Sequence, residues 1–212
     1  MIVAIDAGHG GHDGGAYGGF SKEKDIALTV SKLVSEYLQP YCQPFMTRGS
    51  DVFLSLDTRP TMANNVNADA FVSIHCNSAD NANASGWEIF TTRGQNNSDK
   101  LAEAVGLRYG AANPNMKARF DESDGDLDKE ANFAVIRGTN CPSCLVELGF
   151  ISNQAEELIL NNTQFQRDSA EAIALGILDF LGIKTEAVDA DLEPTLEDRV
   201  ASLEARLARA GF

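Results

Sequence analysis

The sequence predicts an α/β fold in which helices cover a mainly parallel sheet. Short apolar segments alternate with longer segments whose apolar residues recur at helical spacing, and this alternation continues over residues 1–182 of the 212-residue chain. Such alternation is typical of strand–helix–strand units. A composition of 43% hydrophobic and 8% aromatic residues supports a single globular domain with its own core.

The elements are justified in chain order. Residues 1–5 form an apolar strand that ends in a glycine-rich turn, and residues 22–38 carry one apolar stripe at helical spacing. Pro60 must lie in the first turn of a helix over residues 54–66 or kink it. Further strands are predicted at residues 44–47, 70–74, 87–91, 133–136 and 143–147. Further helices are predicted at residues 98–111, 154–161 and 165–181, and the acidic segment 120–130 is predicted to be a solvated loop.

The composition changes after Gly182. Residues 183–194 are polar and acidic, which predicts a linker, and residues 195–212 predict a short amphipathic helix. In this helix the apolar residues are spaced alternately by four and three, as in a coiled-coil seam: Leu196, Val200, Leu203, Leu207 and Ala210. The segment either joins copies of the chain into a homo-oligomer through residues 195–210 or docks on its own domain. Barely two heptads are present, and isolated helices of this length are marginal.

The charge and the apolar segments exclude several classes of partner. A net charge of −14 repels phosphate backbones and anionic lipids, so we expect no nucleic-acid and no membrane partner. No window of 18 residues is both apolar and free of charge. The apolar opening at residues 1–5 is too short for a signal peptide, so the protein is expected to stay in the cytoplasm until something releases it.

The four cysteines are too few for a fold built on disulfides. Cys141 and Cys144 form a CPSC motif, for which redox chemistry or metal binding is one interpretation. The favoured interpretation is a pair of reduced, partly buried thiols.

Candidate metal ligands lie at one edge of the predicted sheet. His9 lies in the turn after the first strand, and His75 lies at the end of the strand over residues 70–74. The carboxyl ends of strands line the binding crevice of an open α/β sheet, so these side chains can converge. Glu23 opens the first helix, and Glu147 ends the strand over residues 143–147. Two imidazoles and two carboxylates suit a catalytic zinc site, which keeps three protein ligands and one open position.

Each of these residues also has a structural interpretation. A histidine after a glycine turn is commonly a loop or capping residue, and a glutamate at a helix start is favoured by the helix dipole. Glu147 is harder to explain in this way, because it follows the apolar residues Leu145 and Val146 into a buried strand end. An unpaired carboxylate is costly there.

Seven motifs follow one another along residues 1–182. They are residues 3–16 (VAIDAGHGGHDGGA), 22–25 (KEKD), Thr47 and Arg48 before Asp51, Arg59 before Ala63 and Asn64, residues 68–77 (ADAFVSIHCN), 86–90 (GWEIF) and 145–153 (LVELGFISN). In this order they resemble the zinc-dependent N-acetylmuramoyl-L-alanine amidases, the catalytic family of bacterial autolysins and phage endolysins.

The resemblance implies a twisted, mostly parallel sheet flanked by helices, and it implies a peptidoglycan substrate. His9, Glu23 and His75 would be the ligands of Zn²⁺, and Glu147 would be the catalytic carboxylate. Members of this family cut the amide between the lactyl group of N-acetylmuramic acid and the L-alanine of the stem peptide. Zinc polarises the scissile carbonyl and lowers the pKa of its water toward about 7, while a carboxylate transfers the proton to the leaving amine.

Further expectations follow from the same motifs. Asn77 and Arg137 lie in matching motifs and are expected to contact the peptide stem. His12 matches no ligand position and is predicted to be a loop residue that lines the groove. Cys76 should point away from the metal, because side chains alternate along a strand.

The function predicted from the sequence is that of a phage or prophage endolysin. Such an enzyme stays in the host cytoplasm until a membrane pore releases it to the cell wall. Alternatives are an exported autolysin, a zinc peptidase or deacylase that acts on another amide, and a non-catalytic wall-binding protein. The presence of all four candidate residues counts against the last of these.

Overall fold

The computed structural model describes residues 1–121 and 127–185 of the chain. The helix predicted at residues 195–212, and most of the linker predicted at residues 183–194, lie outside the described residues.

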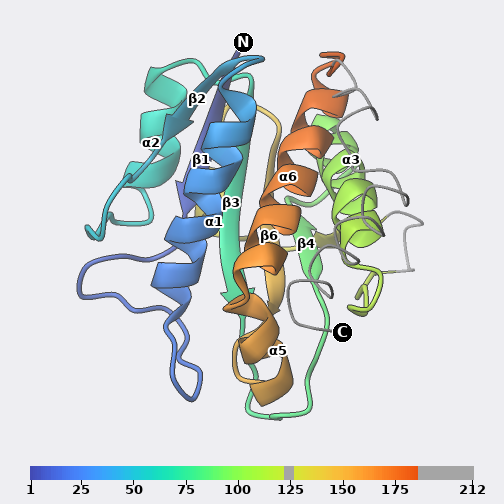
Figure 1. Cartoon of the computed structure of the whole chain (residues 1–212). Coiled ribbons are helices and arrows are strands. Elements are labelled where there is room, and N and C mark those ends of the chain that lie inside the picture. Colours follow the sequence, from blue (N-terminus) through green and yellow to red (C-terminus); the bar gives the residue numbers. More distant parts are fainter. Residues whose placement is uncertain (122–126, 186–212) are drawn as a thin grey trace, which may run out of the picture.

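The described residues form one α/β domain around a six-stranded sheet (Figure 1). The strands have the spatial order β2-β1-β3-β6-β4-β5, in which β1, β2, β3 and β6 are parallel. Strand β4 runs antiparallel to β6, and β5 runs parallel to β4. Their bounds are β1 Ile2–Ala7, β2 Gln43–Met46, β3 Ala70–Asn77, β4 Glu88–Thr91, β5 Lys129–Glu130 and β6 Ser143–Phe150. The prediction of a mainly parallel sheet is confirmed.

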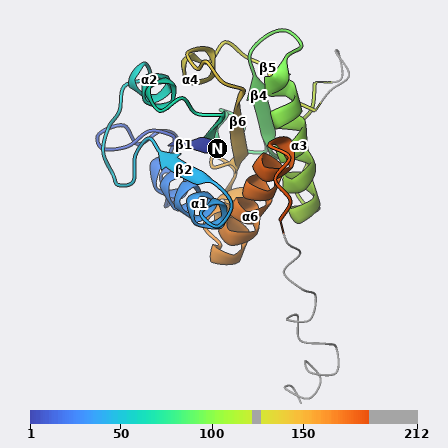
Figure 2. The same ribbon diagram turned by 90° about the horizontal axis from the view of Figure 1, so that it is seen from above.

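Helices lie on both faces of the sheet (Figure 2). Helices α1, α3 and α6 cover one face, and α2 and α4 lie on the other. The helices are α1 Glu23–Leu38, α2 Thr58–Asn65, α3 Asn97–Ala112, α4 Ala134–Arg137, α5 Gln154–Leu160 and α6 Thr163–Phe180. Asparagine caps begin three of them: Asn96 accepts a bond from the Ser98 N–H at α3, and Asn153 and Asn162 each accept bonds from two N–H groups, at α5 and α6.

Alternation along the strands divides the core in two. Val72, Ile74 and Val146 point into the larger cluster, which packs against α1, α3 and α6. Phe71 and Leu145 point to the opposite face, where a smaller cluster packs against α2 and α4. The candidate site residues lie on this second face, where His75, Glu147 and Glu88 occupy one row across β3, β6 and β4.

Two predictions about elements were wrong. The segment predicted as a strand at residues 133–136 is the short helix α4, in which the N–H groups of Arg137 and Gly138 bond to carbonyls four residues earlier. A four-residue apolar run has no decisive period, so strand and helix could not be distinguished. The segment predicted as a solvated loop at residues 120–130 ends in strand β5. Within it, Asp128 is buried and accepts a hydrogen bond of 2.5 Å from the Thr91 hydroxyl.

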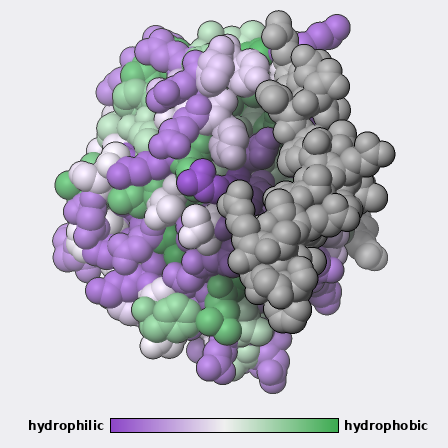
Figure 3. All heavy atoms as spheres, in the orientation of Figure 1, coloured by the Kyte–Doolittle hydropathy of each residue, from purple (hydrophilic) through white to green (hydrophobic). Residues whose placement is uncertain are grey.

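The hydropathy of the surface is consistent with an apolar core that is covered by polar residues. Figure 3 shows mostly hydrophilic residues over α1 and α6, with a hydrophobic group over α5, the helix that carries the exposed Leu158 and Ile159. Among the described residues, no helix has the length and apolar character needed to span a membrane.

Candidate active site

The turn after β1 places His9 in a conformation that is uncommon for a residue with a side chain. Its φ is +60°, in the left-handed region. Two buried arginines hold the turn through its carbonyls. Arg59 donates to the His9 oxygen at 2.7 Å, and Arg48 donates to the Gly8 oxygen at 2.6 Å. The backbone of the turn is therefore fixed from outside the turn itself.

Arg59 is in turn fixed by a buried carboxylate. Its Nη1 lies 2.9 Å from Asp6 Oδ1, and both side chains are almost fully buried. Asp6 also accepts hydrogen bonds from the hydroxyls of Thr47 and Ser73. All polar atoms of this ion pair thus have partners, which is the condition under which a buried ion pair is tolerated.

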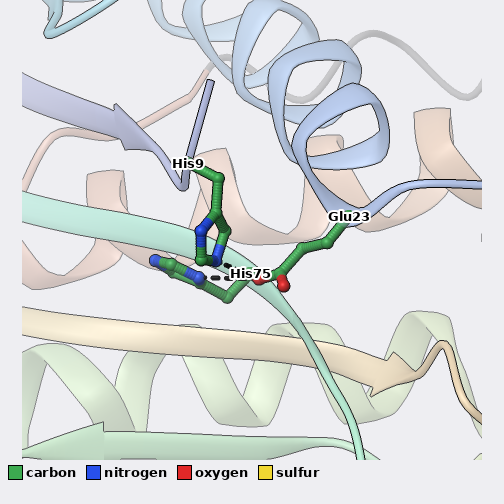
Figure 4. Close-up of side chains that lie close together, drawn as sticks. All are labelled: His9, Glu23 and His75. Atoms are coloured by element: carbon green, nitrogen blue, oxygen red, sulfur yellow. Dashed lines mark hydrogen bonds and ion pairs between the residues drawn. The ribbon is translucent and has the colours of Figure 1, made fainter. Parts of the chain in front are cut away.

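Three side chains converge beside this turn (Figure 4). Glu23 Oε1 lies 3.1 Å from His9 Nε2 and 2.8 Å from His75 Nδ1. One potential ligand atom from each residue lies within 4.8 Å of the other two. The second oxygen of Glu23 accepts the Ala16 N–H at 2.7 Å, which fixes the orientation of the carboxylate. The structure therefore brings together the three residues predicted as metal ligands.

Two glycines make room for these side chains. A Cβ at Gly8 would lie 2.4 Å from the His75 ring, and a Cβ at Gly15 would lie 2.5 Å from both Glu23 and His9. Gly15 also has a φ of +67°, which disfavours any side chain there. The glycine-rich motif is thus required by the close approach of the backbone to the site.

Asp13 orients the His9 ring. Its Oδ2 lies 2.9 Å from His9 Nδ1, so an N–H at Nδ1 leaves Nε2 as the atom that faces Glu23 and His75. A carboxylate on the outer nitrogen of a histidine is a common support for metal ligands. Asp13 was not singled out from the sequence, although it lies in the first motif.

His9, Glu23 and His75 shift one another's pKa values. Burial alone would lower the pKa of His9, but the bond and charge of Glu23, with Asp13, raise it to about 9. Burial opposes ionisation of Glu23, but the two imidazoles hold its pKa well below the usual range. The pKa of His75 is also raised, because Glu23 outweighs burial. In the metal-free protein, proton binding by the two imidazoles and ionisation of Glu23 therefore favour each other.

Glu147 lies beside this cluster, and few interactions offset the cost of burying its carboxylate. It pairs in register with His75 on the neighbouring strand, so both side chains are on one face of the sheet. Its Oε2 is buried and has no hydrogen-bond partner among the described residues. Burial, with the charges of Glu23 and Glu88, raises the pKa of Glu147 from 4.5 to about 7. Such a group can take up and release a proton near neutral pH.

All four residues line one pocket of about 310 Å³. Its other walls include Leu56, Phe133, Val135 and Leu145, so an apolar surface faces the polar groups. A concave, mostly apolar site with a few converging polar groups is typical of small-molecule and substrate sites.

The other residues predicted at the site differ in whether they line this pocket. Asn77 lines the pocket, and its amide donates to Glu88 at 2.5 Å. Arg137 does not line the pocket, and its guanidinium donates to Asn132. His12 stacks on Phe53, with 4.2 Å between ring centroids, and is not among the pocket residues. The substrate contacts of Asn77 and Arg137 stay predictions.

The cysteines lie in the described part of the chain and are free. Cys76 is buried in the larger core cluster, on the face opposite the site, as the alternation of the strand predicts. Cys144 is buried and Cys141 is half-buried, and burial raises the pKa of both thiols, that of Cys141 to about 11. The prediction of reduced thiols agrees with this environment.

The fold and the site together define a hydrolase-type α/β domain with a His–Glu–His cluster. Residues 3–179 match the family model described as N-acetylmuramoyl-L-alanine amidase, so the chain belongs to the N-acetylmuramoyl-L-alanine amidase family. This confirms the resemblance found in the motifs.

Two curated relatives illustrate the range of this family. The N-acetylmuramoyl-L-alanine amidase AmiC of Escherichia coli is 31% identical over 216 residues, which cover 84% of this chain and 52% of AmiC. The chain thus spans about half the length of that relative. The endolysin of Bacillus phage SPP1 is 34% identical over 203 residues, which cover 95% of this chain and 73% of the endolysin.

Solved structures agree with the fold. The catalytic domain of CwlV, an N-acetylmuramoyl-L-alanine amidase from Bacillus (Paenibacillus) polymyxa, superposes with a TM-score of 0.77 at 34% identity, covering 86% of this chain and 99% of that one. The amidase AmiC2 of Nostoc punctiforme superposes with a TM-score of 0.79 at 38% identity, covering 86% and 97%.

Proposed function

We propose that this protein hydrolyses the amide between the lactyl group of N-acetylmuramic acid and the L-alanine of the stem peptide in peptidoglycan. The observation that carries the proposal is the convergence of His9, Glu23 and His75 within 4.8 Å, beside a Glu147 oxygen that has no hydrogen-bond partner among the described residues. Membership of the amidase family supports the same substrate.

The residues present fit a zinc ion. Two imidazole nitrogens and one carboxylate oxygen form a known donor set of catalytic zinc sites. His9 has the outer carboxylate partner that such ligands commonly have. When bound, zinc would polarise the scissile carbonyl and lower the pKa of a water molecule toward about 7.

The protein's own residues supply the remaining steps. Glu147, whose pKa is about 7, accepts the proton of the attacking water and then donates it to the leaving L-alanine nitrogen. Glu23 and Asp13 hold the imidazoles in place. Leu56, Phe133 and Val135 form an apolar wall of the pocket that Glu147 also lines.

A digest of purified peptidoglycan tests this function. The zinc-loaded protein should release fragments with free muramic lactyl carboxylates and new L-alanine amino termini, which mass spectrometry identifies. New ends inside the stem peptide would instead indicate a peptidase. Zinc binding without any new ends would indicate a wall-binding protein.

We also propose an endolysin role, in which the protein stays in the cytoplasm until the membrane is permeabilised. The similarity to the SPP1 endolysin over 95% of this chain supports it. Cells that express the protein should keep their turbidity until a pore-forming agent is added and then lyse. Lysis without permeabilisation would favour an exported autolysin.

A further inference from the structure

A second charged cluster lies next to Glu147 and has no part in the proposed chemistry. Glu88, the first residue of β4, pairs in register with Glu147 and is buried. Its Oε1 lies 2.6 Å from Arg119 Nε and 2.8 Å from Lys129 Nζ. One carboxylate is therefore shared by two cations, which leaves a net positive group beside the site of a protein whose net charge is −14.

The two cations are held in place but keep access to solvent. The Arg119 side chain is 33% exposed and that of Lys129 is 26% exposed. The Arg119 guanidinium lies 5.1 Å from the centre of the Phe150 ring, a geometry that orients it by cation–π attraction. In the described part of the chain, the Lys129 ammonium makes one hydrogen bond, to Glu88, although it carries three N–H groups. With respect to the described residues, donors of Lys129 therefore remain for an anionic ligand.

The cluster stands in line with the site along the sheet. His75, Glu147 and Glu88 occupy one row on successive strands. Neighbouring strands are about 4.8 Å apart, so the row places Glu88 roughly 10 Å from His75. Asn77, which lines the pocket, bonds to Glu88 and connects the two regions.

The separation of Glu88 from His75 fits a substrate whose leaving peptide carries a carboxylate. A peptide chain advances at most about 3.5 Å per residue, so the second residue after the scissile amide reaches roughly 7 Å from it. In the stem peptide that residue is a γ-linked D-glutamate with a free α-carboxylate. The disaccharide on the other side of the amide offers no comparable anion.

We propose that Arg119 and Lys129, positioned by Glu88, bind the free α-carboxylate of the second stem-peptide residue. The inference rests on the proposed function, because it assumes that the bound stem peptide extends from the scissile amide across β6 and β4. It makes these two residues determinants of specificity for acidic over amidated stem peptides.

Peptide binding tests the proposal without any bond being broken. The probes are L-Ala-γ-D-Glu-L-Lys with an amidated C-terminus and the same peptide with the D-glutamate α-carboxylate converted to carboxamide. Calorimetry measures both with the full chain, with Arg119→Gln and with Lys129→Gln. Arg108→Gln is the matched control, because Arg108 Nε also lies 2.6 Å from a carboxylate, that of Asp179, but on α3.

The unchanged protein and Arg108→Gln should bind the acidic peptide about tenfold more tightly than the amidated one, a difference of about 1.4 kcal/mol. Arg119→Gln and Lys129→Gln should each lose most of this preference, with unchanged affinity for the amidated peptide. Equal binding of the two peptides by the unchanged protein, or no measurable binding, would overturn the proposal. Equal weakening of both peptides by the variants would also overturn it, because it would indicate a purely structural role.

Failure of the carboxylate site and failure of the proposed function can be distinguished. A protein that discriminates between the peptides but releases no new ends from peptidoglycan contradicts the amidase activity and leaves the carboxylate site standing. A protein that cleaves the amide but does not discriminate contradicts the carboxylate site alone.

Discussion

Replacing Glu147 by glutamine separates proton transfer from metal binding. The amide keeps the shape of the side chain but cannot accept a proton at neutral pH. We expect turnover of peptidoglycan to fall about 10²–10⁴-fold, the usual loss when general acid–base help is removed. Zinc content should stay near stoichiometric, because the three converging ligand atoms belong to His9, Glu23 and His75. Glu23→Gln should lose zinc, because it replaces the oxygen that lies between both imidazoles.

The same substitution has a stability effect whose size follows from the pKa of Glu147. Below pH 4.5 the carboxyl group is protonated in both the folded and the unfolded chain, so it does not affect stability. As the pH rises from 4.5 to about 7 the unfolded chain ionises first, and the metal-free fold loses stability. The loss is complete above about pH 7. It amounts to at most about 3 kcal/mol, from 1.36 kcal/mol per pKa unit.

Glutamine at position 147 removes this penalty. The metal-free Glu147→Gln protein should therefore be more stable than the unchanged protein at pH 8, by up to about 3 kcal/mol, and close to it at pH 4. Urea unfolding in the presence of a chelator measures both differences, metal analysis gives the zinc content, and dye release from labelled peptidoglycan gives the turnover. A stability difference that does not grow with pH would refute the interpretation of Glu147 as a strained buried carboxylate. Zinc lost from Glu147→Gln but kept by Glu23→Gln would mean that ligand and base are reversed.

Three further predictions concern the ligands, the support of the turn and the tail. His9→Ala should lose zinc and activity together while His12→Ala keeps both, as metal analysis and dye release would show; zinc lost from His12→Ala would contradict the ligand assignment. Arg59→Leu should destabilise the protein by about 3–5 kcal/mol in urea unfolding, because it leaves Asp6 buried without its cation. A loss below about 1 kcal/mol would mean that the pair is not a support of the turn. Leu203→Asp should convert an oligomer of the full chain into a monomer by light scattering, if the tail forms a coiled coil; equal masses for the two proteins would exclude this.

The order of strands and helices could be predicted from the sequence, but the ends of the strands could not. Periodicity places a strand at residues 70–74, whereas β3 continues to Asn77 and β6 continues to Phe150. Asn77 and Phe150 pair with each other beyond an irregularity in the ladder. The strand end therefore depends on a partner that is distant in sequence. For this reason His75 lies within β3, in register with Glu147 of β6, rather than just beyond its strand.

The convergence of the candidate residues could be predicted where a local rule applied. The rule that strand ends share one edge, together with the motif resemblance, predicts that the candidate residues converge. In the structure one pocket is lined by all four: His9, Glu23, His75 and Glu147. The cluster around Glu88 follows no local rule, because Arg119 and Lys129 lie 31 and 41 residues from it. Lys129 reaches it through the pairing of β4 with β5, and Arg119 reaches it through the hydrogen bond from its N–H to the Trp87 carbonyl. Its one signal was the glutamate of the GWEIF motif, whose tryptophan is buried in the core.

The fold holds its site in a conformation that costs stability. His9 adopts a left-handed conformation, which costs roughly 1–2 kcal/mol for a residue with a side chain, and Glu147 keeps a buried oxygen that has no partner in the described part of the chain. The ion pair of Arg59 and Asp6 and the arginine bonds to the turn keep the backbone in place despite this cost. A divalent cation bound by the three ligands would compete with protons for the imidazole nitrogens. Because such an ion binds the folded chain in preference to the unfolded chain, the strain at the site and the affinity for the ion are two aspects of one preorganised arrangement.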